Sequence, residues 1–471
     1  MIFVNSEVSN LKKILIHFPD QGLSRVVPHK AQDWLFEDIV DLEIIKHKEY
    51  IYYMQLLLYF LDPQKIKNIP HEKLEDINFY NAQSNLFHNS EFVIEIEKLL
   101  LDILQNESIR SEMTAAIVAF EECPFIYFKE FKTYTVGQLA QTFITGISPK
   151  GLQFFPPVPN FIFTRDIGIV IHNFLILNKP AKAARQREAI IMRFIFNYHD
   201  LFKEIRNNII ELDDLYPSFF SFTEDEETDI MTLEGGDVMM IHPQHVIIGI
   251  SERTSTAAAK ELANLLLNKC HIKKVTLLKI PAKRDFMHID TIFTQVKKDF
   301  WVLYDEFAKN CPQFPVQATK LSLTNDNIHF STQIYQFQLG QPEPTYFNSI
   351  FDLLTDVSMT DFGCKNKPTI VFSGNKEYPF NSREQWTDSC NLLALKEGVV
   401  IGYDRNRYTI DAFKKHGFNI VHVEDILNDF KCGKVEPQNL ENTFILMPSA
   451  ELSRARGGFH CMSLPLQREK I

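Results

Sequence analysis

Paired apolar runs separated by short polar turns recur along the second half of the chain, and this pattern predicts β-hairpins. The clearest pair occupies 167–171 and 174–177, with His172 and Asn173 at the turn. Similar pairs follow at 237–241 with 245–250, and at 291–296 with 300–304.

A helix and then a further strand are predicted after these hairpins, from apolar residues at helical spacing followed by a single apolar run. The predicted helices are 31–61, 183–196, a segment capped by Thr254 or Ser255 and ending at 267, and 410–416. The predicted single strands are 11–17, 274–280, 369–373, 399–403, 418–423 and 443–447. The recurring order of hairpin, helix and strand indicates a pseudo-symmetric α/β architecture.

Two stretches interrupt this pattern. Residues from about 62 to 150 have helical periodicity and little strand signal, and a helix beginning near Ser90 would contain Val93. We interpret about 62–150 as a helical insertion within the α/β domain. Residues 305–365 carry no clear pattern and are interpreted as a second insertion.

Composition and charge exclude several classes of protein. The chain has 471 residues, 60 acidic against 49 basic, and its lysines and arginines form no stripe, which argues against a nucleic-acid partner. The longest apolar run, 51–61, is too short to span a bilayer and contains Gln55. The N-terminus lacks the pattern of a signal peptide. The seven cysteines are scattered without a Cys-x-x-Cys pair, so neither disulfides nor a zinc site is indicated. We therefore expect a soluble, cytoplasmic protein.

Cys461 is the first candidate for chemistry because it lies in a loop that contains Gly457 and Gly458, with Arg456 and His460 beside it. Cationic neighbours lower the pKa of a thiol, so this setting predicts a thiolate-enriched nucleophile. An isolated cysteine is more often a small buried hydrophobe. The hypothesis therefore depends on a base and substrate-holding carboxylates elsewhere in the chain.

Such groups lie where predicted hairpin strands begin. Asp166 precedes the first hairpin, and Glu234 and Asp237 flank two glycines before the second. His288 and Asp290 precede the third, at a spacing that would place both side chains on one face of a strand. Taken singly, these motifs are also typical of ordinary turns and satisfied polar pairs.

Together the residues fit nucleophilic attack at a guanidinium carbon. A guanidinium is planar and cationic, and it binds carboxylates that accept its N–H groups. Two aspartates and a glutamate around one cation, with a thiol and a histidine, supply the binding groups, the nucleophile and the acid–base group for that reaction.

At this point the chain resembles the arginine deiminases of the guanidino-group-modifying superfamily. The matching stretches occur in order along nearly the whole chain. They are 4–7, 35–39, 157–166, 185–188, 234–238, 251–255, 287–294, 383–388, 403–406 and 456–463.

The resemblance implies five hairpin-helix-strand units arranged as a five-bladed α/β propeller, with residues 1–471 as one catalytic domain and about 62–150 inserted in it. It implies hydrolysis of L-arginine to L-citrulline and ammonia without a metal or organic cofactor. It also implies a homodimer or a higher homo-oligomer.

The resemblance also assigns roles to the catalytic residues. Cys461 would attack the guanidinium carbon, and Asp166 and Asp290 would grip the guanidinium nitrogens. His288 would protonate the departing ammonia and then activate water to hydrolyse the thiouronium adduct. Glu234 would orient His288 and contact the substrate.

The remaining roles concern the rest of the substrate. Asp237 is treated as a supporting residue. The α-carboxylate would be held by Asn160, Arg185, Arg253 and Arg456, and Phe163 would pack near the substrate stem. On their sequence context alone, Arg185 and Arg253 read as surface charges.

Two features depart from the family pattern. The chain is longer, through extra residues within 62–150 and 305–365. Phe459 stands where the family usually has a smaller residue or proline, and its ring would stiffen or crowd the nucleophile loop.

Alternative functions stay open at this stage. The same core could act on a methylated arginine or agmatine, or transfer an amidino group to an amine, although a carboxylate clamp argues against agmatine. The chain could also be a catalytically weak arginine sensor, although the complete set of catalytic residues argues against that.

Overall fold

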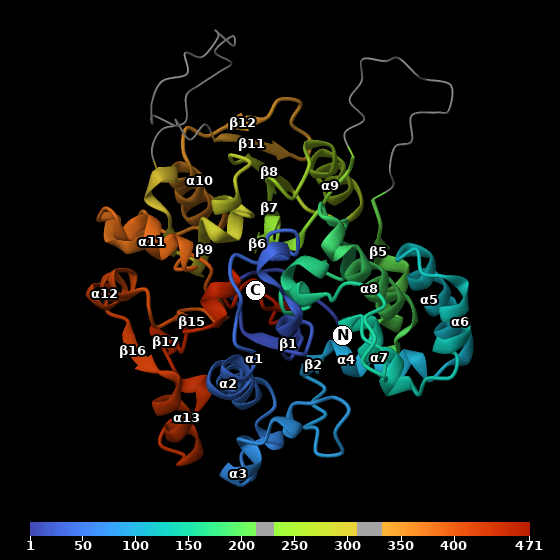
Figure 1. Ribbon diagram of the computed structural model, residues 1–471. Coiled ribbons are helices and arrows are strands. Elements are labelled where there is room, and N and C mark those ends of the chain that lie inside the picture. The colour runs from blue at the N-terminus through green and yellow to red at the C-terminus, as the bar shows by residue number, and fades with distance from the viewer. Residues whose placement is uncertain (213–229, 309–331) are drawn as a thin grey trace, which may run out of the picture.

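The computed structural model describes residues 1–212, 230–308 and 332–471, and part of the predicted 305–365 insertion lies outside these ranges. The described residues form a mixed α/β fold with five β-sheets. Figure 1 shows the sheets and their helices distributed around a central region in which the C-terminus lies.

Each sheet combines an antiparallel strand pair with a parallel neighbour. The first two units along the chain contain β3 (Gly168–Ile171), β4 (Phe174–Leu177), α8 (Gln186–Tyr198) and β5 (Ile209–Ile210), and then β6 (Val238–His242), β7 (His245–Ile250), α9 (Thr256–Lys269) and β8 (Lys274–Lys279). Helices carry the chain from each hairpin to its parallel strand, as the repeating pattern predicts.

The third and fourth units follow the same plan with additions. The third contains β9 (Phe293–Lys297), β10 (Phe300–Leu303), α10 (Ile350–Asp356) and β13 (Thr369–Phe372). Two further strands, β11 (Gln333–Gln338) and β12 (Thr345–Tyr346), extend the sheet of β8 instead. The fourth contains α11 (Phe380–Trp386), β14 (Leu393–Lys396), β15 (Val399–Tyr403), α12 (Arg407–Lys415), β16 (Asn419–His422), α13 (Val423–Lys431) and β17 (Thr443–Met447).

The fifth sheet joins the two ends of the chain. Its strand order is β18–β1–β2, comprising Leu464–Arg468, Leu11–Ile16 and Val93–Glu95. β18 pairs antiparallel with β1, and β2 lies parallel on the other side of β1. This sheet therefore has the same plan as the others, although its first strand is the last along the chain.

Residues 62–150 contain several helices and also one strand of the fifth sheet. The helices are α3 (His71–Leu74), α4 (Ile96–Leu104), α5 (Glu107–Phe120), α6 (Phe125–Phe131) and α7 (Val136–Thr145). The prediction that Val93 belongs to a helix was wrong, because it pairs with Ile14 in β1. A β-branched residue suits a pleated, paired strand, and the partner lies too far away in sequence for local periodicity to reveal it.

The predicted helix over 31–61 was also wrong in its first third. Residues 31–35 form turns, and Leu35 has a φ of 68°, which ends any helix there. The helical run begins after Asp41, whose side chain accepts hydrogen bonds from the backbone of Glu43 and Ile44. It comprises α1 (Leu42–Ile44), a π-helical turn (Ile45–Tyr50) and α2 (Ile51–Leu61).

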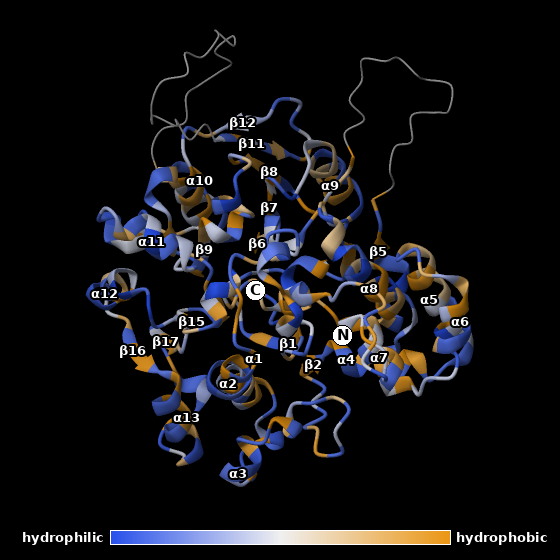
Figure 2. Cartoon of the chain, viewed as in Figure 1, coloured by the Kyte–Doolittle hydropathy of each residue, from blue (hydrophilic) through white to orange (hydrophobic). Residues whose placement is uncertain are grey.

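The outer helices carry both hydrophobic and hydrophilic positions, as Figure 2 shows for α2 and α5. Their apolar residues join buried clusters beneath them. Among the described helices, none has both the length and the apolar character needed to cross a membrane.

Candidate active site

The predicted catalytic residues share one position in the fold: they lie just before the first strand of a sheet's hairpin or antiparallel pair. Asp166 precedes β3, Glu234 precedes β6, His288 and Asp290 precede β9, and Cys461 precedes β18. Short turns at these points release the chain from strand geometry. The equivalent ends of different sheets thereby bring their side chains to one place.

Cys461 is buried, and its Sγ lies 3.5 Å from Asp290 Oδ2. Burial, together with the carboxylates of Asp290, Asp166 and Asp388, raises the pKa of the Cys461 thiol well above its usual range. The prediction that sequence neighbours lower this pKa was therefore wrong.

The side chains of those neighbours are engaged elsewhere. Arg456 stacks 3.7 Å above the Trp386 ring and donates to the Trp386 carbonyl. His460 places Nδ1 2.9 Å from Asp290 Oδ2 and Nε2 3.2 Å from Glu7 Oε2. Both side chains are thus bonded to other groups, and burial together with the carboxylates determines the direction of the thiol pKa shift.

His288 lies between two carboxylates. Its Nε2 is 2.9 Å from Glu234 Oε2 and its Nδ1 is 3.7 Å from Asp166 Oδ1. Burial acts to lower the pKa of His288, but Asp166, Glu234 and Asp237 outweigh it and raise the pKa to about 10. The same contacts outweigh burial at Glu234, where His288 and Arg253 lower the pKa to about 2. At neutral pH the pair is an imidazolium and a carboxylate.

Gly236 permits this close packing. A Cβ at that position would lie 2.6 Å from His288 Nδ1 and 3.0 Å from Asp166 Oδ1. Its backbone N–H donates to Asp166 Oδ1 at 3.0 Å. The paired glycines noted in the sequence thus serve close approach between two functional side chains.

Asp290 has one occupied and one available oxygen. Oδ2 contacts His460 and Cys461, whereas Oδ1 is buried without a hydrogen-bond partner among the described residues. Burial acts against ionisation, but His460 lowers the pKa of Asp290 overall. A buried, ionised carboxylate with a free acceptor is suited to receive an N–H group of a cation.

Arg185 is the most heavily bonded of the predicted carboxylate-binding residues. It donates to Asp166 Oδ2 at 2.5 Å, to Glu188 Oε2 at 2.9 Å, and to the carbonyls of Asn160 and Phe163. Burial acts to lower the pKa of Arg185, but Glu188 and Asp166 raise it overall. The prediction from context that Arg185 is a surface charge was wrong, because its side chain is only 3% exposed.

Arg253 is likewise buried rather than on the surface. Its Nη1 is 3.8 Å from Glu234 Oε1, and its Nη2 is 3.6 Å from Met287 Sδ. Asn160 donates to the Trp34 carbonyl at 2.7 Å. The predicted binding residues therefore surround one place, although Asn160 and Arg456 contact the protein backbone here.

One cavity brings most of the candidate residues together. Its volume is about 20 Å³, far below the roughly 300 Å³ and upward typical of ligand pockets. Side chains must therefore move to admit an amino acid. The lining residues are Leu35, Asn160, Phe163, Asp166, Arg185, Glu234, Arg253, Met287, His288, Arg456 and Cys461.

Two predicted residues lie behind this lining. Asp290 contacts Cys461 from one side, as described above. Asp237 accepts hydrogen bonds from Ser251 Oγ at 2.6 Å and from the Ile289 backbone at 3.1 Å, and burial raises its pKa to about 6. Asp237 thus braces the turn that carries His288, as expected of a supporting residue.

Phe459 does not line the cavity. Its ring is fully buried and packs against Tyr53 and Tyr403, with ring centroids 5.0 and 5.1 Å away. These contacts anchor the nucleophile loop, which agrees with the expectation that the Phe459 ring would stiffen that loop.

Several residues at the site were not identified from the sequence. Glu188 pairs with Arg185 at a spacing of three residues, and this spacing was a usable signal. Glu7 and His460 form a buried chain with Asp290 that joins distant segments, and no local pattern predicts it. Asn391, which accepts a hydrogen bond from the Cys461 backbone at 3.0 Å, was also missed.

Asp166, Glu234 and His288 offer ligand atoms within 4.8 Å of one another, a spacing that could hold a metal ion. A cation there would meet Arg185, which is paired with Asp166, and the positive field of Arg253 beside Glu234.

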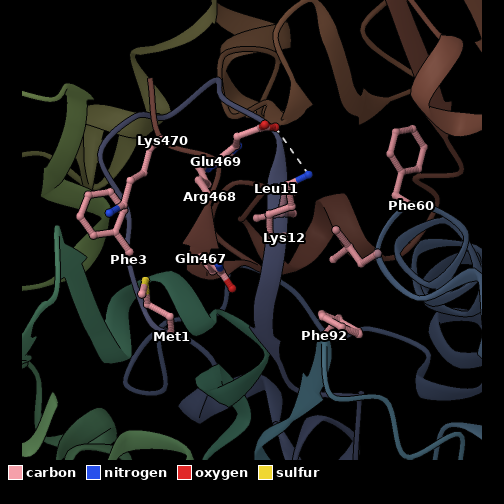
Figure 3. A pocket seen from close by; sticks show the side chains of 11 residues that line it. Met1, Phe3, Leu11, Lys12, Phe60, Phe92, Gln467, Arg468, Glu469 and Lys470 are labelled. Carbon is pink, nitrogen blue, oxygen red and sulfur yellow. Dashed lines mark ion pairs between the residues drawn. The ribbon is translucent and has the colours of Figure 1, made fainter. Parts of the chain in front are cut away.

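A larger hollow lies elsewhere, at the edge of the β18–β1–β2 sheet (Figure 3). Its volume is about 550 Å³, and Phe3, Phe60 and Phe92 line it together with the Lys12–Glu469 ion pair. The described residues around it include neither a thiol nor a histidine and none of the candidate residues. The candidate chemistry therefore belongs to the smaller cavity.

The chain is similar to several known proteins. A family model described as Arginine deiminase matches residues 132–468. The arginine deiminase of Borrelia garinii subsp. bavariensis is 28% identical over 485 residues, covering 100% of this chain and 98% of that protein. The arginine deiminase of Bacillus cereus is 27% identical over 497 residues, covering 100% of this chain and 99% of that protein. Among solved structures, SxtG, an amidinotransferase from Microseira wollei, matches with a TM-score of 0.43 and 15% identity, covering 100% of this chain and 98% of that one. Because the family model runs from the helical region to the last strand of the fold, the chain belongs to the arginine deiminase family.

Proposed function

We propose that the protein hydrolyses L-arginine to L-citrulline and ammonia, with Cys461 as the nucleophile. The observation that carries this proposal is the convergence of a thiol, an imidazolium–carboxylate pair and buried arginines on one cavity. The thiol supplies the nucleophile, and the imidazolium–carboxylate pair supplies the proton donor. The arginines supply counter-charges for an α-carboxylate.

We propose further that residues 1–471 form one catalytic domain, a five-bladed α/β propeller with a helical insertion over about 62–150. The shared plan of the five sheets supports this arrangement. The arrangement is also supported by four sheets that each have a proposed functional residue just before their first strand.

Substrate binding would begin with an exchange of partners. The guanidinium of arginine would take the place of Arg185 at Asp166 and donate to the free Oδ1 of Asp290. Arg185, still held by Glu188, would turn with Arg253 toward the α-carboxylate. Asn160 and Arg456 would complete that contact, and Phe163 would pack along the aliphatic stem.

The first chemical step forms a bond between Cys461 Sγ and the guanidinium carbon. The arriving cation favours the thiolate, because it offsets the carboxylates that raise the thiol pKa, and the thiol proton is released to solvent. The C–N bond to one terminal nitrogen then breaks, and the His288 imidazolium supplies the proton with which that nitrogen departs as ammonia. A thiouronium adduct on Cys461 remains.

The second step consumes water. Neutral His288 accepts a proton from the water as its oxygen attacks the thiouronium carbon, and Glu234 holds the ring 2.9 Å away in position. The C–S bond then breaks as the remaining hydroxyl proton passes to the sulfur, which leaves the ureido group of citrulline and restores the Cys461 thiol. Over the cycle, arginine and water give citrulline and ammonia, and no electrons leave the system.

The buried arginines favour L-arginine over guanidine compounds that lack a carboxylate. Agmatine lacks the carboxylate that Arg185 and Arg253 would bind, so it would forgo the charge-assisted hydrogen bonds that these two arginines offer. This argues for a free amino acid and against a decarboxylated guanidine. We further propose that the enzyme acts in the cytoplasm as a homodimer or higher homo-oligomer, as the family resemblance implies.

The test is incubation of the purified protein with L-arginine, agmatine, a methylated arginine, or arginine plus an amine acceptor. Ammonia and ureido product are quantified for each. Cys461→Ala is the inactive variant, and Cys270→Ala, which removes a buried thiol at the end of α9, is the matched control. Citrulline formed from arginine by the wild type and by Cys270→Ala, but not by Cys461→Ala, is expected. Amidino transfer to the amine, or tight arginine binding without product, would overturn the proposal.

A further inference from the structure

We propose that Asn391 is a positioning residue for the deiminase reaction, which holds the Cys461 loop and Asp290 in fixed relation to each other. This inference rests on the proposed function, because it concerns the geometry of the nucleophile and its carboxylate.

The first argument is the position of Asn391 in the fold. Four sheets each place a proposed functional residue shortly before the first strand of their hairpin or antiparallel pair: Asp166, Glu234, Asp290 and Cys461. The remaining sheet begins its hairpin with β14 at Leu393, and Asn391 lies two residues before it, as Asp166 does before β3. Asn391 therefore occupies in the fourth unit the place that carries chemistry in the other four.

The second argument is its hydrogen bonds. Asn391 Oδ1 accepts from the Cys461 backbone N–H at 3.0 Å, and its Nδ2 donates to the Asp290 carbonyl at 3.1 Å. Its own carbonyl accepts from the His460 backbone at 3.4 Å. One side chain thus joins the turn before β9 to the turn before β18, the two segments whose side chains meet at 3.5 Å.

The third argument is the fit of the loop around it. Asn391 is fully buried, and a Cβ at Gly458 would lie 2.6 Å from its carbonyl oxygen and 2.7 Å from its Oδ1. Glycine at 458 lets the nucleophile loop lie directly on Asn391. A fully buried amide with both ends bonded has no freedom to move without breaking one of these contacts.

The fourth argument is charge. Three carboxylates, those of Asp290, Asp166 and Asp388, act to raise the pKa of the Cys461 thiol, whereas the Asn391 side chain acts to lower it. A neutral amide can hold the loop without adding a fourth negative charge beside the sulfur. Aspartate has nearly the same shape, but it would add that charge and lose the donor to Asp290.

Asn391→Asp and Asn391→Ser test the proposal, with Asn406→Asp as matched control. Asn406 is also buried and also donates to and accepts from one neighbour, Thr387, outside the cavity lining. Steady-state kcat and KM for arginine are measured for each protein. The alkylation of Cys461 by iodoacetamide is followed against pH without substrate.

We expect kcat of both Asn391 variants to fall on the order of 100-fold, the size expected when a catalytic group shifts by about 1 Å. KM should change less than about threefold, because no residue proposed to bind the carboxylate contacts Asn391. Alkylation of Cys461 should move to higher pH in Asn391→Asp, while Asn406→Asp should match the wild type in every measurement.

Several results would overturn the proposal. These are retention of kcat in Asn391→Asp, a loss expressed in KM instead, the same loss in Asn406→Asp, or an unchanged alkylation profile. Loss of the near-ultraviolet circular dichroism of both Asn391 variants would assign Asn391 to folding alone and equally overturn it. A wild-type protein that produces no citrulline would reject the proposed function. Alkylation of Cys461 requires no turnover, so its pH profile would still decide whether Asn391 positions Cys461.

Discussion

Cys461 is expected to be a protonated thiol in the substrate-free protein. The structure sets a lower limit to how strongly its alkylation rate should depend on pH. An ordinary thiol, with a pKa of about 8.5, is about 3% ionised at pH 7. Burial and the nearby carboxylates raise the pKa of Cys461 further, so less than this fraction is thiolate. Alkylation at Cys461 should therefore accelerate more than about 30-fold between pH 7 and its plateau, since only the thiolate reacts.

The assay is timed reaction of the substrate-free protein with iodoacetamide from pH 6 to 10.5, with each thiol identified by peptide mass spectrometry. The exposed Cys432 serves as an internal reference in the same molecule. In Asp166→Asn, one of the carboxylates that raise the thiol pKa is removed, so the Cys461 profile should move to lower pH.

The reasoning fails if Cys461 reaches its plateau below about pH 8, or if it reacts faster at pH 7 than the exposed Cys432. Either result would mean that a cation faces the sulfur in solution. Arg456 and His460 would then have left the contacts to Trp386 and Asp290 that keep them from it. An unchanged profile in Asp166→Asn would contradict the electrostatic argument separately.

Three further predictions concern the rest of the site. His288, whose folded pKa is raised to about 10 from an ordinary 6.5, should act as a proton donor across the neutral range. The raised pKa of His288 should stabilise the folded state fully below about pH 6.5, and this stabilisation should be lost as the pH rises to about 10. Glu234→Gln should move that loss to lower pH, which melting temperatures and kcat measured against pH would show. Arg185→Gln should raise KM for arginine roughly 10- to 100-fold, because it removes charge-assisted hydrogen bonds to the carboxylate; an unchanged KM would place the carboxylate elsewhere. Phe459→Ala should cost about 3–5 kcal/mol of unfolding free energy, because its ring is packed between Tyr53 and Tyr403; denaturant unfolding beside Phe459→Leu measures this, and equal stability of the two variants would contradict the packing argument.

The elements that the sequence predicted well are those whose stability is local. The β6–β7 hairpin has continuous apolar runs on either side of a turn, and Ser255 caps α9 by accepting a hydrogen bond from the Ala258 backbone N–H. Such patterns are complete within about fifteen residues. Val93 in β2, by contrast, depends on a partner strand about eighty residues earlier, and sequence periodicity cannot report that contact.

The site was predicted in its composition but not in its electrostatics. The family prediction is confirmed, and the geometry brings its catalytic set together. The direction of the Cys461 pKa was wrong because adjacency in sequence does not fix where a side chain points. Arg456 has a left-handed backbone with φ of 64°, and its guanidinium lies over Trp386. The acidic residues that face the sulfur come from three distant turns.

The sheet that unites β18 with β1 and β2 has a consequence for how the protein comes into being in a cell. During translation β1 leaves the ribosome long before β18, which is its antiparallel partner. Residues 464–468 follow Cys461 by only a few positions, so the segment that completes this sheet and the segment that supplies the nucleophile emerge together. A nascent chain would thus hold an unfinished sheet edge until this segment emerges, and the site would lack its proposed nucleophile for the same length of time.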